Sequence, residues 1–235
     1  MRCRRPCWLL AAALGLPLPA APALAALAAV DTLAQRIAPC TACHAATDTR
    51  HGTAYFPRIA GKPACYLYNQ LINFREGRRQ YPVMATMVAH LPDAYLHEIA
   101  DYLAGQHAPS PVPPALVGAD PVLLERGRVL AMLGDGARGV PACVACHGQA
   151  LTGTLPAVPG LIGLPRDYVN AQFGAWRNGT RRAAAPDCMA TIAARLSRAD
   201  IHAVSTWLAG QPFAPEARPA ATFAHRLPLA CGSVP

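Results

Sequence analysis

The chain has 235 residues, a formal net charge of +8 at pH 7 and an isoelectric point of about 9.3. A basic chain can indicate nucleic-acid binding, but no arginine cluster is interleaved with aromatic residues as a nucleic-acid groove requires, so we expect no nucleic-acid partner. The length suits two small domains better than one, and an aromatic content of 6% indicates cores that are filled partly by a bound cofactor.

The N-terminal segment, up to Ala28, predicts a secretory signal peptide. A basic start at residues 2–5 precedes the apolar run Trp8–Leu16, and small residues suit cleavage after Ala25 or Ala28. A retained membrane anchor is the weaker alternative, because three prolines interrupt the apolar stretch. We therefore expect export to the periplasm.

Two stretches of the same kind follow, Cys-x-x-Cys-His at residues 40–44 and again at 143–147. They predict covalent haem attachment, in which two thiols add to the vinyl groups and the histidine supplies one axial ligand to iron. A zinc site would need a second ligand pair near each first pair, and a thioredoxin-like dithiol would follow a Val/Ile-rich strand. Neither context is present, so we expect two covalently bound haem c groups, attached at Cys40 and Cys43 and at Cys143 and Cys146, with His44 and His147 as iron ligands.

An internal repeat surrounds these motifs. Four residues match at an offset of 102, and Leu103–Gln106 matches Leu208–Gln211 at an offset of 105; the four pairs are Tyr66 and Tyr168, Gln70 and Gln172, Gly77 and Gly179, and Arg79 and Arg181. The three extra residues of the second copy are expected in a loop before Met189. We predict a signal peptide at 1–28, a first domain at 29–107, a proline-rich linker at 108–118, a second domain at 119–212 and a proline- and alanine-rich tail at 213–235 that lies over the surface.

Apolar periodicity predicts three helices in each copy and no convincing strand. In chain order the predicted helices are Val30–Ala38, Ala64–Glu76, Asp93–Gly105, Pro121–Leu133, Arg166–Asn178 and Arg198–Gly210.

The second axial ligand of each iron is predicted to be a methionine, the usual partner of histidine when the potential must be high. Met84 follows His44 at nearly the same separation as Met189 follows His147, and the two stand equally far before the leucine that opens the last helix of their copy. These two methionines are therefore equivalent, and we expect each in a loop before that helix. Met87 and Met132 have no such match and are expected in the cores.

Other repeated residues suggest supporting roles. Pro57 and Pro159 follow the motif histidines at nearly equal separations, so each could offer a backbone carbonyl to the histidine ring, although an ordinary loop proline is the alternative. The repeated tyrosines and arginines could bind haem propionates or form a solvated helix face. The six remaining histidines do not recur between the copies and are expected at the surface.

Three cysteines outside the motifs and the signal peptide allow at most one intramolecular disulfide. These are Cys65, Cys188 and Cys231. We expect the bond between Cys188 and Cys231, because both belong to the second half of the chain.

Taken together, these motifs resemble the di-haem cytochrome c4 family over about Val30 to Gln211. The resemblance implies an all-α fold of two tandem class I cytochrome c domains, each wrapped around one covalent haem c, with the haem propionate edges toward the interface. The chain departs from the family pattern at Cys65, at Cys188 beside the expected ligand Met189, and in its tail.

The resemblance also implies a function. It indicates an electron-transfer protein rather than an enzyme, a periplasmic carrier between a quinol-oxidising complex or a dehydrogenase and a terminal oxidase, with peripheral membrane association possible. Two alternatives remain open: a cytochrome subunit of a larger periplasmic dehydrogenase, or a di-haem enzyme such as a peroxidase, in which one iron has an open site.

Overall fold

The computed structural model describes residues 31–44, 56–107, 118–214 and 216–234. The predicted signal peptide and nearly all of the predicted linker lie outside the described residues, as does His51. None of the helices in the described part of the chain is both long and apolar enough to span a bilayer.

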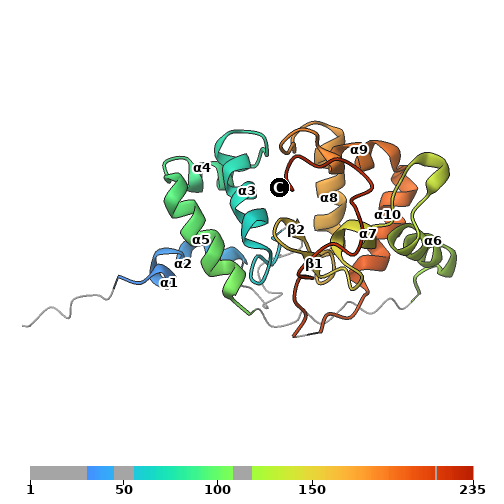
Figure 1. Ribbon diagram of the computed structural model, residues 1–235, viewed down its shortest axis with the longest axis horizontal. Helices are drawn as coiled ribbons and strands as arrows, with labels where there is room; N and C mark the ends of the chain where they lie inside the picture. Colours follow the sequence, from blue (N-terminus) through green and yellow to red (C-terminus); the bar gives the residue numbers. More distant parts are fainter. Residues whose placement is uncertain (1–30, 45–55, 108–117, 215, 235) are drawn as a thin grey trace, which may run out of the picture. The chain divides into compact units, whose positions relative to one another are not determined.

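The described residues are mostly helical, in two successive sets (Figure 1). The first set comprises α1 (Leu33–Arg36), α2 (Ala38–His44), α3 (Ala64–Arg75), α4 (Pro82–Val88) and α5 (Asp93–Gly105). The second comprises α6 (Pro121–Met132), a 3₁₀ turn (Gly136–Arg138), α7 (Val144–His147), α8 (Arg166–Arg177), α9 (Cys188–Arg195) and α10 (Arg198–Ala209). Between α7 and α8 lies a small antiparallel hairpin, β1 (Gly153–Thr154) with β2 (Val158–Pro159).

The predicted helices are confirmed within one residue at each end, except for the first. In place of one helix over residues 30–38, the chain forms α1 and α2, which are separated at Ile37. Thr32 and Gln35 form a capping box that starts α1, and the buried Ile37 is its C-cap. The second of these helices, α2, contains the first Cys-x-x-Cys-His motif.

The expectation that Met84 and Met189 lie in loops is wrong, because each lies in a short helix. Pro82 occupies the first turn of α4, where its fixed φ favours a helix start. Asp187 caps α9 by accepting a hydrogen bond from the backbone N–H of Ala190 at 3.0 Å. The three extra residues of the second copy do fall in the loop before α9, as predicted.

Each helical set has its own apolar core. In the first, α3 packs against α5, with Leu67, Ile99 and Leu103 buried. In the second, α10 packs against α6 and α8. Gly127 allows α6 to approach α10 closely, because a Cβ at this position would lie 2.3 Å from the carbonyl oxygen of Ala203. Met132 packs against this core, but Met87 is 42% exposed, so its predicted core position is wrong.

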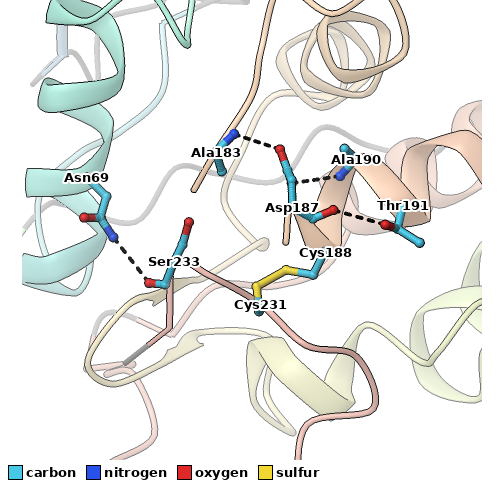
Figure 2. The surroundings of a disulfide bond; sticks show 8 residues. All are labelled: Asn69, Ala183, Asp187, Cys188, Ala190, Thr191, Cys231 and Ser233. Carbon is cyan, nitrogen blue, oxygen red and sulfur yellow. Dashed lines mark hydrogen bonds between the residues drawn. A yellow bond between two sulfur atoms is a disulfide. The ribbon is translucent and has the colours of Figure 1, made fainter. Parts of the chain in front are cut away.

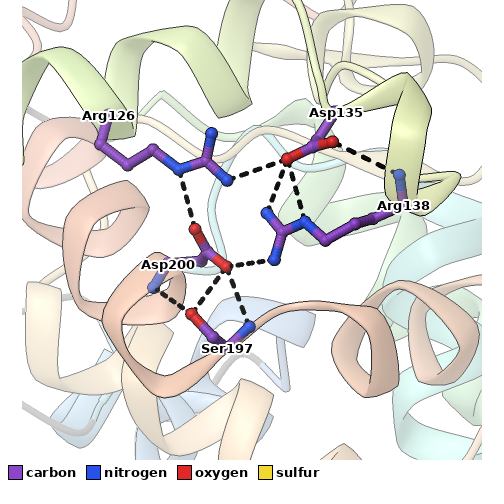
Figure 3. A network of polar contacts seen from close by, with 5 residues as sticks. All are labelled: Arg126, Asp135, Arg138, Ser197 and Asp200. Atoms are coloured by element: carbon purple, nitrogen blue, oxygen red, sulfur yellow. Dashed lines mark hydrogen bonds and ion pairs between the residues drawn. The ribbon is translucent and has the colours of Figure 1, made fainter.

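An ion-pair network around the buried Asp200 ties α6 to α10 in the second set (Figure 3). The carboxylate of Asp200 accepts from Arg126 Nε at 2.9 Å and from Arg138 Nη1 at 2.7 Å, and Asp135 accepts from both arginines. Ser197 and Asp200 also form the capping box of α10. Burial alone would raise the pKa of Asp200, but the hydrogen bonds from Arg138, Ser197 and Arg126 outweigh it and hold the pKa well below its usual range.

Asp200→Asn is therefore expected to destabilise the protein by about 2–4 kcal/mol at pH 7, because two arginines lose their shared charge partner. A carboxylate with a lowered folded-state pKa stabilises the fold above the unfolded-state pKa and loses this contribution as the pH falls. The difference between variant and wild type should consequently shrink below about pH 4 in urea unfolding. Glu125→Gln, which alters an exposed pair with Arg128, is the matched control and should change little. Equal stability of both variants would contradict this role of Asp200.

Candidate haem sites

The second predicted site is a single pocket that brings together residues from distant parts of the chain. Cys143, Cys146 and His147 line it from the segment around α7, and Met189 lines it from α9. Most of the remaining wall is apolar, including Leu130 and Phe173. Two thiols, an imidazole and a thioether around an apolar cavity match what a covalently attached haem requires.

The ring of His147 is held by the carbonyl predicted from the sequence. Its Nδ1 lies 2.7 Å from the carbonyl oxygen of Pro159 on β2. An Nδ1–H that donates there leaves the lone pair on Nε2 free for a metal. Burial lowers the pKa of His147 to about 4, so at neutral pH the ring is uncharged, which is the form that binds iron.

The first site repeats this arrangement. His44 Nδ1 lies 2.8 Å from the carbonyl oxygen of Pro57, and burial lowers the pKa of His44. Cys40 is half-buried and Cys43 is exposed, both on α2, while Met84 packs against the apolar cluster between α3 and α5 that includes Phe74. Residues 45–55, which follow the motif, lie outside the described part of the chain.

Three of the four motif cysteines have raised pKa values, unlike the thiols of a reactive redox dithiol. Burial raises the pKa of Cys143 to about 12 and also raises that of Cys40 and Cys146. A reactive dithiol needs a lowered thiol pKa. Within the described ranges, no group of three or more His, Cys, Asp or Glu side chains could hold a metal ion. The raised pKa values disfavour a reactive dithiol.

One unsatisfied buried donor fits a haem propionate. The indole Nε1 of Trp176 is buried, lacks a partner within the described residues and belongs to the wall of the second pocket. Buried indole N–H groups normally have an acceptor, and a carboxylate of the cofactor would provide one. The first copy has Phe74 at the equivalent position, so the two sites differ here. The sequence reasoning missed Trp176, although the match of two aromatics at an offset of 102 was a usable signal.

Six repeated polar residues form a hydrogen-bonded cluster between the two copies, which belong to one compact unit of the chain. We call this the paired-arginine cluster: Tyr66, Gln70, Arg79, Tyr168, Gln172 and Arg181. Arg79 donates to Gln70 at 2.9 Å in its own copy and to Gln172 at 2.7 Å in the other. Arg181 donates in the same way to Gln172 at 2.7 Å and to Gln70 at 3.2 Å.

The backbone joins the copies at the same place. Arg79 and Arg181 form an isolated antiparallel bridge, in which Gln80 donates to the carbonyl of Thr180 and Arg182 donates to that of Arg78, each at 2.7 Å. Arg181 is only 6% exposed, so the alternative of a solvated helix face does not hold for it.

Three cationic side chains lie near the second pocket: Arg79, Arg181 and Lys62. Burial lowers the pKa of Arg181, and the nearby Arg79 lowers it further. Lys62 is also buried, with its Nζ 3.2 Å from the carbonyl oxygen of Gly160, and burial lowers its pKa to about 7. Among the described residues none of these three cations pairs with a carboxylate. Buried charge of one sign is costly, and haem propionates would offset it. The sequence reasoning missed Lys62, for which the second copy has Leu164.

The remaining sequence predictions concern side chains outside these pockets. The disulfide Cys188–Cys231 is present as predicted, and Cys65 is a free, exposed cysteine. The five unmatched histidines within the described ranges are all exposed, as expected.

Comparison with known proteins gives a consistent picture. No protein-family model matches the chain. It is 37% identical to a thiosulfate dehydrogenase electron acceptor from Thiomonas intermedia over 181 residues, 76% of this chain and 81% of that protein. It is 35% identical to a cytochrome c4 from Pseudomonas aeruginosa, over 74% of this chain and 85% of that protein. The crystal structure of reduced cytochrome c4 from Pseudomonas stutzeri superposes with a TM-score of 0.63 at 31% identity, covering 75% of this chain and 95% of that one.

Proposed function

Because the chain belongs to the cytochrome c4 family, it is a di-haem electron carrier with two covalent haem c groups, and we propose that it accepts electrons from a periplasmic dehydrogenase and passes them toward a terminal oxidase. The observation that carries this proposal is the convergence of Cys143, Cys146, His147 and Met189 on one apolar pocket, repeated in sequence at the first site. Electron transfer requires no open coordination position for a substrate on the iron, and ligation by both a histidine and a methionine would leave no such position.

The chain's own residues hold and tune the cofactor. Haem supplies reversible one-electron exchange at its iron. Cys40 and Cys43, and Cys143 and Cys146, would hold the two groups covalently, which permits exchange without loss of the cofactor. The carbonyls of Pro57 and Pro159 orient the imidazoles of His44 and His147 and fix their tautomer.

The paired-arginine cluster places positive charge where the two copies meet. Arg79 and Arg181 each donate to side chains of both copies, so each guanidinium lies at the join of the copies, toward which the family resemblance implies that the propionate edges point. Positive charge there favours the propionates in their ionised form and favours reduced over oxidised iron. The two haems would then exchange electrons within one rigid, positively charged interface.

A thiosulfate dehydrogenase is the first candidate donor. The relative from Thiomonas intermedia is named as the electron acceptor of such an enzyme, and the identity of 37% extends over most of both chains. A quinol-oxidising complex is the second candidate, which the family resemblance implies. Export by the predicted signal peptide would place the protein in the periplasm, where peripheral membrane contact could bring it to an oxidase.

Stopped-flow spectroscopy of the oxidised holoprotein tests the proposal. We expect rapid reduction of both haems by a thiosulfate dehydrogenase plus thiosulfate, none by thiosulfate alone, and reoxidation by a terminal oxidase. Rapid reduction by a quinol-oxidising complex but not by the dehydrogenase would select the second donor. Reduction by neither, or turnover of a substrate by the protein alone, would reject the carrier proposal. Stable co-purification with a dehydrogenase would favour the subunit alternative.

A further inference from the structure

The C-terminal segment crosses the second pocket and does not simply lie over the surface. We call residues 216–234 the C-terminal strap. It starts beside the hairpin: Ala220 bridges Thr154 in parallel, accepts from Leu155 N at 2.8 Å and donates to the Gly153 carbonyl at 2.9 Å. The same hairpin provides the Pro159 carbonyl that holds His147. One end of the strap is thus fixed on the histidine side of the site.

The other end of the strap is bonded to α9, the helix that carries Met189 (Figure 2). Cys231 is bonded to Cys188, the first residue of α9 and the neighbour of Met189, with 5.0 Å between the Cα atoms. Gly232 donates to the carbonyl of Pro186 at 2.9 Å. A Cβ at Gly232 would lie 2.2 Å from the carbonyl oxygen of Ala185, so this contact admits only glycine without rearrangement.

Between these fastenings the strap forms part of the pocket wall. Leu227 and Leu229 line the same cavity as Met189, and Val234, just beyond the disulfide, lines it too. Ser233 accepts a hydrogen bond from Asn69 Nδ2 of α3 at 3.3 Å, so the strap also reaches the first copy. The apolar side chains face a site that must exclude water if the methionine is to stay on the iron.

The first site lacks the cysteine to which the strap is bonded. Val83 stands where the second copy has Cys188, and it is 61% exposed on α4. Its neighbours Tyr81 and Met87 are also exposed. The disulfide that fastens the strap beside Met189 therefore has no counterpart beside Met84.

We propose that the C-terminal strap is a cover for the methionine side of the second haem site, kept closed by the Cys188–Cys231 disulfide, which shields Met189 and the iron from exogenous ligands. The proposal rests on the haem assignment above. An exogenous ligand can replace the methionine only while the strap is displaced, so its apparent affinity scales with the displaced fraction. Without the disulfide this fraction rises.

The test is cyanide binding to the oxidised holoprotein with Cys231→Ser, followed by the Soret shift. We expect the apparent affinity of one haem to rise about tenfold or more, with the other haem unchanged. Cys65→Ser removes an exposed cysteine that forms no disulfide and should behave as wild type. Met84→Ala and Met189→Ala proteins identify which haem responds. A response at the first haem, or none at either, overturns the proposal.

A second approach needs no substitution. Treatment of the wild-type holoprotein with a dithiol, alkylation of the released thiols and reoxidation of the haems should reproduce the effect, and protease cleavage within residues 216–234 should accelerate in parallel. Accelerated cleavage without any change in cyanide binding would show that the strap does not shield the iron. Failure of the haem assignment is distinguishable, because Met189→Ala would then leave the spectrum of the oxidised protein unchanged.

Discussion

Met189→Ala is expected to lower the reduction potential of the second haem by on the order of 100 mV or more, a fraction of the roughly 0.8 V range that axial ligands span. A thioether donor stabilises reduced iron, and water or hydroxide in its place does not. The variant should also bind cyanide at one haem and lose half of the weak methionine-to-iron charge-transfer band. Redox titration of the purified protein measures the shift, and the absorption spectrum at the red edge measures the band.

Two matched variants make this result specific. Met84→Ala should produce the same changes at the first haem alone, because the two methionines occupy equivalent helices, α4 and α9. Met87→Ala removes a thioether from the same helix as Met84, but its side chain is 42% exposed, so both potentials should stay unchanged. Unchanged potentials in Met84→Ala or Met189→Ala would remove that residue from the ligand set.

The candidate ligand sets come from the sequence alone, because covalent attachment needs a local motif and the duplication repeats the separations between the candidate ligands. The motifs mark four cysteines and two histidines directly, and the repeat selects Met84 and Met189 from the four methionines that follow Met1. The hydrogen bonds of His44 and His147 to the carbonyls of Pro57 and Pro159 followed from the same logic. The histidine–carbonyl contacts were thus predictable from the sequence, and the iron ligands remain a prediction from it.

Features set by tertiary contacts were not predictable. The helices α4 and α9 span seven and eight residues, too few for periodicity to reveal, and they are fixed by a proline and an aspartate at their starts. Exposure of Met87 depends on which face of α4 meets the core. The strap has no periodic pattern, and its path depends on pairing with β1 and on the disulfide.

The paired-arginine cluster was recognisable only as repeated polar residues. Nothing in a linear repeat tells whether equivalent residues of two copies face each other. The structure brings Arg79 and Arg181 together across the join, where each donates to glutamines of both copies. We expect two guanidinium groups at such a junction to act on both haem sites, which gives the cluster a testable electrostatic role.

Arg79→Gln is accordingly expected to lower the reduction potentials of both haems, whereas the methionine variants affect one haem each. A unit charge about 8 Å from an iron contributes about 2 kcal/mol at an effective dielectric constant near 20, or ~90 mV for one electron. Arg181→Gln should act in the same direction on both. Because the two arginines share Gln70 and Gln172, the double variant should deviate from the sum of the single shifts.

Arg128→Gln provides the control for net charge. It removes one positive charge from the exposed surface of α6, where Arg128 pairs with Glu125, and solvent screening should leave both potentials nearly unchanged. The two-step redox titration of each variant, repeated at low and high ionic strength, gives both potentials. Shifts confined to one haem would mean that the cluster serves a single site, and shifts equal to those of Arg128→Gln would mean that its charge does not reach either iron. A salt-insensitive lowering of both potentials is the result expected of a buried cationic junction shared by two haems.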